Sequence, residues 1–379
     1  MMNPILISIL LGMTVPAKDP KFEAQVIDDK VSIGYGLAVG DVDGDGKPDI
    51  LLADKKEFVW YRNGDWKRFV MVANLTEADN VCIAARDIDG DGKVEVAVGA
   101  QWNPGETSDA EKSGSVHYLI RPDDPTQRWT PVKLHHEPTT HRMHWVKAGD
   151  KYQLIVLPLH GRGNKDGEGS GVKATAYEVP QNPRGQWKHE FIDETMHLTH
   201  NFDPVADGNG ERLYIGGKEG IKVMDFRQGK WTTSGWTVKG KGVGEVRLGN
   251  LATTGPFLTA IEPMHGNQLT VYTGRDFASR SVLSDNLKQG HAIATGDLLD
   301  LGHDQIVAGW REANSENKFG VKIFVAQNTE GALWKDYWID DNGMACEDLK
   351  VADLDGDGKP DIVAAGRSTH NLKVYWNKN

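Results

Sequence analysis

The feature that most constrains this chain is an acidic, glycine-rich nonapeptide that occurs three times. It reads DVDGDGKPD from Asp41, DIDGDGKVE from Asp87 and DLDGDGKPD from Asp353. Each copy has carboxylates at positions 1, 3, 5 and 9, and carboxylates so close together repel one another unless a hard cation binds their oxygens. The glycines permit the tight backbone that lets the position-7 carbonyl join them. We therefore predict three calcium loops.

The residue at position 12 decides what kind of calcium loop this is. An EF-hand would need a glutamate there and a helix after the loop. Position 12 is Leu52, Val98 or Ala364, each within a β-branched run, so the loops join two strands; a solvated acidic turn without metal is the alternative. The predicted ligands are Asp41, Asp43, Asp45, Lys47 and Asp49; Asp87, Asp89, Asp91, Lys93 and Glu95; and Asp353, Asp355, Asp357, Lys359 and Asp361, the lysines through their carbonyls.

A strand, a DxDGDGxxD loop, a second strand and a closing small residue form a unit that resembles the FG-GAP or VCBS repeat of β-propellers, as in the integrin α-subunit head. The resemblance is specific for the three repeats with complete loops and degenerate for the rest of the chain. It implies a propeller fold with structural calcium in the blade loops.

The chain divides into seven repeats of short apolar or aromatic segments, each of about 50 residues, a usual size for a propeller repeat. The sixth repeat keeps only Asp297, Asp300 and Asp304 of a calcium loop, and the seventh ends after three segments. The unpaired segment FEAQVI (residues 22–27) resembles the missing fourth, so we predict that it pairs with residues 372–376. The predicted fold is all-β: a single seven-bladed β-propeller of four-stranded blades over residues 18–379, closed by this N-terminal strand.

Residues 1–17 are predicted to be a secretory signal peptide. They contain the apolar run ILISILLGMTV and end in Val15, Pro16 and Ala17, a small-residue pattern typical of a cleavage site. The run is too short to remain as a membrane span. We therefore expect a secreted or periplasmic protein with no membrane span after cleavage.

The charge balance argues against nucleic acid as a partner, because phosphate binding needs a basic surface and the formal net charge is −11. The two cysteines, Cys82 and Cys346, occur in non-neighbouring repeats. A disulfide is one option, but isolated small apolar cysteines are usually free and buried, so we expect two free thiols.

A second functional face is predicted opposite the calcium loops. The first strand of each blade ends at its loop and the second strand returns antiparallel, so first-strand starts and second-strand ends share this face. Eight of the thirteen histidines fall there, although any single one is also explained as a solvated loop residue. The predicted catalytic residues are His144, His160, Arg162, His200, Glu262, His265, His291, Arg311 and His370, and the predicted substrate contacts are Trp102, Trp310 and Arg367.

Of these residues, His144, His200 and His291 occupy similar first-strand positions, so we expect their rings to converge in the channel. Imidazoles act as bases or bind a divalent transition metal as Lewis acid, and arginine binds a carboxylate or enolate oxygen. Tryptophan side chains offer faces for sugar rings. Such a funnel suits an oxidised or acidic carbohydrate, or another small anionic ligand.

At the level of fold and site face, the chain resembles the propeller part of fungal aldos-2-ulose dehydratases and, more loosely, propeller polysaccharide lyases. The resemblance implies an exported lyase, dehydratase or isomerase acting on a sugar, although these 379 residues contain no cupin domain. The alternative is a propeller that binds glycan or protein without chemistry. A quinone-dependent sugar dehydrogenase is a third option, for which the sequence has no identifying signature.

Overall fold

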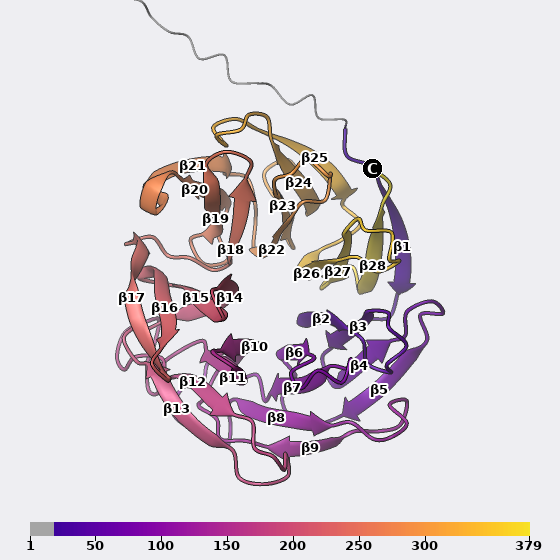
Figure 1. Ribbon diagram of the computed structural model, residues 1–379, viewed down its shortest axis with the longest axis vertical. Helices are drawn as coiled ribbons and strands as arrows, with labels where there is room; N and C mark the ends of the chain where they lie inside the picture. Colours follow the sequence, from indigo (N-terminus) through magenta and orange to yellow (C-terminus); the bar gives the residue numbers. More distant parts are fainter. Residues whose placement is uncertain (1–18) are drawn as a thin grey trace, which may run out of the picture.

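The computed structural model describes residues 19–379, so the predicted signal peptide lies outside the described residues. Seven four-stranded antiparallel sheets stand as blades around a central channel (Figure 1). The predicted all-β, seven-bladed propeller is confirmed. Among residues 19–379, no helix is long and apolar enough to cross a bilayer.

In each of the first six blades the strands follow one another outwards from the channel. Blade one contains β2 (Gly36–Gly40), β3 (Asp49–Ala53), β4 (Glu57–Tyr61) and β5 (Arg68–Ala73), and blade two β6 (Cys82–Arg86), β7 (Glu95–Ala100), β8 (Ser115–Ile120) and β9 (Thr130–Lys133). Blade three contains β10 (Thr140–Ala148), β11 (Lys151–Pro158), β12 (Ala174–Glu178) and β13 (Lys188–Asp193), and blade four β14 (Thr199–Asp207), β15 (Gly210–Gly217), β16 (Gly220–Arg227) and β17 (Lys230–Lys239).

The remaining blades complete the ring. Blade five contains β18 (Val246–Leu251), β19 (Gly255–Glu262), β20 (Gln268–Thr273) and β21 (Ser279–Ser284), with the short 3-10 helix η1 (Arg275–Phe277) before its last strand. Blade six contains β22 (Gly290–Gly296), β23 (Gln305–Trp310), β24 (Gly320–Ala326) and β25 (Trp334–Asp341), and blade seven β26 (Cys346–Ala352), β27 (Asp361–Gly366) and β28 (Asn371–Asn377).

Blade seven takes its outer strand from the other end of the chain. β1 (Phe22–Asp28) pairs antiparallel with β28, from Phe22 opposite Asn377 to Asp28 opposite Leu372. Figure 1 shows this strand lying against the outer edge of the last blade. The predicted closure of the ring by FEAQVI is therefore confirmed, and it leaves β28 without an exposed edge.

The hydrophobic core lies between neighbouring blades. Both faces of each sheet pack against other sheets, so the second strands are almost continuous apolar runs, and every residue of β3 and β27 is buried. The side chains of Trp60 and Trp129 fill one such layer between blades one and two. This packing fixes the inner strands and hence the side chains that face the channel.

The acidic loops adopt a shared backbone geometry. In the loop between β2 and β3, the Asp41 carboxylate accepts hydrogen bonds from the backbone N–H groups of Gly44 and Gly46, at 2.6 and 2.8 Å. These glycines have φ values of 82° and 83°, a left-handed conformation that other residues avoid. The loop thereby gathers the carboxylates of Asp41, Asp43 and Asp45.

The other two loops gather Asp87, Asp89 and Glu95, and Asp353, Asp355 and Asp357. Together the acidic clusters are consistent with the calcium loops of FG-GAP repeats. The contributions of Asp91, Asp49 and Asp361 and of the lysine carbonyls stay predictions.

The acidic loops are linked to neighbouring blades by asparagine side chains. The Asn63 amide donates to the carbonyls of Pro48 in its own blade and Leu354 in blade seven, at 2.9 and 2.7 Å. Asn377 makes the equivalent pair of bonds to Pro360 and to Leu298 in blade six. The backbone conformation of each of these loops is therefore held in part by hydrogen bonds to the neighbouring blade.

The sixth-blade loop keeps the backbone shape but replaces a carboxylate with an amide. Asp297 accepts the N–H groups of Leu301 and Gly302, as Asp41 does in blade one. At position 9 stands Gln305, whose amide nitrogen donates to the position-7 carbonyl of His303 at 2.6 Å. A carbonyl that would face a cation in a calcium loop is here satisfied by a protein N–H.

Cys82 and Cys346 are buried, free thiols, as expected. Burial raises the pKa of Cys82 to about 12, so its thiol is protonated and unreactive.

Candidate metal centre in the central funnel

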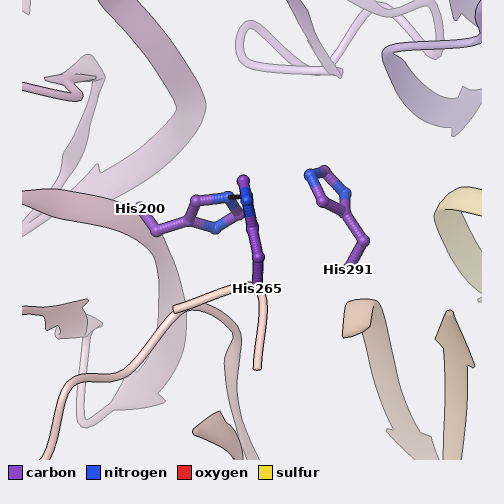
Figure 2. Close-up of side chains that lie close together, drawn as sticks. All are labelled: His200, His265 and His291. Carbon is purple, nitrogen blue, oxygen red and sulfur yellow. Dashed lines mark hydrogen bonds between the residues drawn. The ribbon is translucent and has the colours of Figure 1, made fainter. Parts of the chain in front are cut away.

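Three imidazoles converge at the end of the channel opposite the acidic loops (Figure 2). His200 and His291 are the second residues of the inner strands β14 and β22, and His265 lies in the turn between β19 and β20. The Nε2 atoms of His200 and His265 are 2.6 Å apart, and the ring of His291 lies 4.8 Å from that of His265. One ligand atom from each of the three residues lies within 4.8 Å of the others.

His265 reaches the cluster from an unusual backbone position. Its φ value is 52°, in the left-handed region that non-glycine residues seldom occupy outside turns. The following Gly266 leaves no space for a side chain, since a Cβ there would lie 2.2 Å from the Glu262 carbonyl oxygen. The turn therefore directs the His265 ring inwards.

The partners of the other two rings fix which nitrogen faces the cluster. His291 Nδ1 donates to the backbone carbonyl of Glu347 at 2.6 Å, and His200 Nδ1 lies 3.0 Å from the carboxylate of buried Glu245. Both contacts place the proton on Nδ1 and leave the Nε2 lone pair directed at the shared space. Metal-binding histidines are oriented by such carbonyl and carboxylate partners.

The electrostatics keep these imidazoles neutral. Burial, with the charges of His200 and Arg311 added, lowers the pKa of His265 to about 2. Burial likewise places the pKa of His291 well below its ordinary value. Neutral imidazole is the form that binds metals.

The residues present fit a divalent transition metal. Without a cation, one of the two Nε2 atoms at 2.6 Å must hold a proton to make the contact, and a cation would take the place of that proton. Three histidines around an open fourth position is the ligand set of catalytic rather than structural zinc sites.

A fourth histidine stands beside the cluster. The ring of His141, on β10, lies 4.7 Å from that of His200 and 5.0 Å from the indole of Trp102. Its Nδ1 hydrogen-bonds the His200 carbonyl at 2.9 Å, so that Nδ1 holds the proton. Within residues 19–379, Nε2 of His141 has no hydrogen-bond partner, so its lone pair is free to accept a hydrogen bond.

A buried carboxylate collects two arginines on the other side of the funnel. Glu347 is 2 % exposed and binds Arg311 at 2.7 Å and Arg367 at 3.0 Å. The Arg367 guanidinium also lies over the ring of Tyr35, whose pKa is raised to about 12 by burial and by Asp79. These contacts fix cationic N–H donors near the three histidines.

The three histidines that converge differ from the predicted three, because His265 takes the place expected for His144. The ring of His144 packs edge-on against Phe202 at 4.7 Å and lines a cavity of about 580 Å³ on the calcium-loop side of the channel. His144 lies three residues further along β10 than His141 and so sits deeper in the channel, since successive residues advance along a strand. The expected convergence of His144 with His200 and His291 is therefore wrong.

Several other predicted site residues are buried and make packing or hydrogen-bond contacts within their blades. Trp310 is 2 % exposed and packs against Trp338, so it offers no face to a sugar, which corrects that prediction. Glu262 is buried among Thr270, Tyr272 and Arg280. These side chains stabilise blades rather than line the funnel.

The rim residues from blades three and seven lie in loop contacts. His370 bonds the carbonyls of Val31 and Ser32 and so ties blade seven to the start of the chain. Arg162 pairs with Glu137 at 3.1 Å, and His160 forms a bridge to Leu198 in blade four. Of the predicted residues, His200, His265, His291, Arg311, Arg367 and Trp102 surround the funnel.

The predicted residues omit three side chains that the structure places at the centre. Glu245 and Glu347 immediately precede or begin an inner strand, and His141 occupies the matching place in β10. Their shared position at first-strand starts was the available signal. Which of two neighbouring histidines on β10 faces the cluster depends on the local register.

Comparisons with known proteins agree with the geometry. Residues 41–98 match the model of an FG-GAP-like repeat, and residues 113–275 match that of the aldos-2-ulose dehydratase β-propeller domain. Aldos-2-ulose dehydratase from Phanerodontia chrysosporium is 23% identical over 261 residues. The chain is a distant relative of aldos-2-ulose dehydratase. The match covers 64% of this chain and 28% of that enzyme, so the chain spans under a third of its relative.

The aldos-2-ulose dehydratase match over residues 113–275 includes His141, His200 and His265, whereas His291 lies beyond it. Two solved structures share the fold. A chain in the crystal structure of a mitotic checkpoint complex has a TM-score of 0.59 at 11% identity over 99% of both chains. The WD40 β-propeller domain of Doa1 has a TM-score of 0.54 at 10% identity, covering 95% of this chain and 98% of its own. Identities this low indicate the fold alone.

Proposed function

We propose that this propeller is an exported, metal-dependent lyase that removes water from an oxidised sugar. The observation on which the proposal rests is the convergence of His200, His265 and His291, three neutral imidazoles with oriented Nε2 atoms and an open position. The distant relationship to aldos-2-ulose dehydratase supports the class of reaction.

In such a dehydration a base removes the proton from a carbon next to a carbonyl. The electron pair of that C–H bond becomes a C=C bond, and the hydroxyl group on the neighbouring carbon leaves with a proton as water. The reaction needs a base, a proton donor and positive charge near the carbonyl oxygen.

The funnel offers a residue for each part. His141 Nε2 is the base, since Nδ1 is fixed by the His200 carbonyl, and the imidazolium formed gives that same proton to the leaving hydroxyl group. Arg311, fixed by Glu347, donates hydrogen bonds to the developing enolate oxygen, and Trp102 lies beside His141 as a face for the sugar ring. The three histidines would hold a divalent ion, which would supply Lewis acidity near the carbonyl oxygen.

The calcium loops lie at the opposite end of the inner strands and serve stability in this proposal. Calcium and the transition metal have different ligand sets, because calcium takes oxygen donors and the funnel offers nitrogen. The two metals can therefore be exchanged separately.

The test is a screen of oxidised sugars and uronate oligosaccharides for unsaturated or dehydrated products, with zinc, cobalt or manganese supplied. His200→Ala, His265→Ala and His291→Ala should each abolish turnover, whereas His160→Ala, in a loop contact, should retain it. The melting temperature of each variant reports folding. Binding of glycans with no product, unchanged in the three variants, would favour the non-catalytic binding module instead.

A further inference from the structure

The charges around the funnel do not balance. Glu245 is occupied by His200 and, at 3.6 Å, by Arg247. Glu347 is occupied by Arg311 and Arg367. Each buried carboxylate is thus already shared between cationic or hydrogen-bonding partners.

Arg142 on β10 is the cation left over. Its Nη1 donates to the carbonyl of the preceding residue, His141, at 3.1 Å. Across residues 19–379, no carboxylate oxygen lies within the 4.0 Å of an ion pair from its guanidinium. The other four N–H groups have no protein acceptor in the described chain, and the side chain is only partly exposed.

The position of Arg142 is central. Its charge contributes to the lowered pKa of all three cluster imidazoles, His200, His265 and His291. It also lies next to His141, whose ring touches that of His200. A guanidinium without a counter-ion, in a confined site that would also hold a divalent cation, attracts an anion.

We infer that Arg142 binds a carboxylate of the substrate, which makes the natural substrate a sugar acid rather than a neutral sugar. A planar guanidinium matches a planar carboxylate through two parallel N–H···O bonds. A phosphate group would call for several cationic or backbone donors, and Arg142 is the one funnel arginine not already bound to a carboxylate in the described chain. This inference rests on the proposed function, because it names the substrate class of the same site.

The direct test is binding, measured by calorimetry with the zinc-loaded protein. D-gluconate and D-glucuronate, as probes, should bind, and D-glucose should bind at least about tenfold more weakly. Arg142→Gln should weaken the binding of the two acids by about 10- to 100-fold, the usual effect of losing a hydrogen-bonded charge pair. It should leave the affinity for D-glucose unchanged. Arg142→Lys should recover only part of the loss, since lysine lacks the planar fork.

The control is Arg86→Gln, because Arg86 lies on the calcium-loop side of the channel and is paired with Glu211 at 2.8 Å. It should leave binding of the acids unchanged. Equal affinities for acid and neutral sugar, or equal loss of both in Arg142→Gln, would overturn the inference.

Turnover separates this inference from the proposed function. A protein that dehydrates an oxidised sugar, but turns over sugar acids equally well in wild type and in Arg142→Gln, retains the proposed function and refutes the carboxylate site. A protein that binds sugar acids through Arg142 but converts no sugar acid or oxidised sugar retains the carboxylate site and refutes the lyase.

Discussion

Glu245 is the residue that most clearly shows how the funnel prepares a metal ligand. It is 2 % exposed, and His200 and Arg247 hold its pKa at about 2 although burial alone would raise it. The carboxylate is therefore ionised and lies 3.0 Å from His200 Nδ1. The nearby negative charge makes the lone pair of His200 Nε2 a stronger ligand for a cation.

We predict that Glu245→Gln weakens transition-metal binding by about 10- to 100-fold, as other losses of an orienting partner do. Metal competition with a chromogenic chelator measures the change. The matched control is Glu219→Gln, since Glu219 contacts His197 at 2.8 Å on the same face but outside the cluster. Equal affinity of Glu245→Gln and wild type would show that Glu245 does not orient His200 for metal.

His117 gives a prediction at a residue remote from every metal site. It is 7 % exposed, and burial, together with the charge of Lys133, lowers its pKa from 6.5 to about 4. In the unfolded chain it takes up a proton near its ordinary pKa, and in the folded chain it does not. Stability is thus present at neutral pH and is lost as the pH falls from about 6.5 towards 4.

Between pH 7 and pH 5, this single residue should cost about 2 kcal/mol of unfolding free energy. Urea denaturation at both pH values, in wild type and His117→Gln, isolates the contribution because the variant has no proton to gain. A pH dependence of equal size in both proteins would assign the acid sensitivity to other groups.

At the scale of the structural element, the acidic loops are expected to act as calcium-dependent turns. Asp45→Ala should lower the melting temperature in calcium, by about 1–2 °C for each kcal/mol of binding free energy lost. In excess chelator, wild type and variant should melt together. Asp150→Ala, in the exposed β10–β11 turn that lacks the motif, is the control and should melt like wild type in both buffers.

The N-terminal strand is an element whose loss should open the ring. Removing residues 1–27 strips β28 of the partner that it pairs with from Leu372 to Asn377. An unpaired edge promotes association between molecules, so this truncation should aggregate, as seen by light scattering. A truncation of residues 1–18, which keeps β1, should stay monodisperse; a monodisperse 1–27 truncation of unchanged stability would contradict the role of β1.

At the scale of the whole molecule, the fold was predictable because its information is local and repeated. Three complete loops fixed the period, and alternating apolar segments and the unpaired FEAQVI gave the blade count and the closure. The pairing of β1 with β28 is confirmed. This contact joins the two ends of the chain, and it was predictable because the last repeat lacks its fourth strand.

The sequence predicted which end of the propeller carries the candidate site, but not which residues there come together. Which histidine on β10 joins the cluster depends on strand register, and His141 rather than the deeper His144 contacts His200. Trp310 appeared to be a substrate contact because it ends a strand at the funnel, yet it is buried against Trp338. Such choices depend on packing between blades, which a single repeat does not reveal.

The central claim is that His200, His265 and His291 together bind a divalent transition metal. Titration of the calcium-saturated protein with Co²⁺ tests it most directly, because cobalt in a low-symmetry histidine site absorbs visible light and calcium does not. We predict one equivalent of absorbing Co²⁺ in wild type, lost in His200→Gln, His265→Gln and His291→Gln and retained in His144→Gln. A wild-type protein without this absorption, or one whose absorption survives all three substitutions, would contradict the claim.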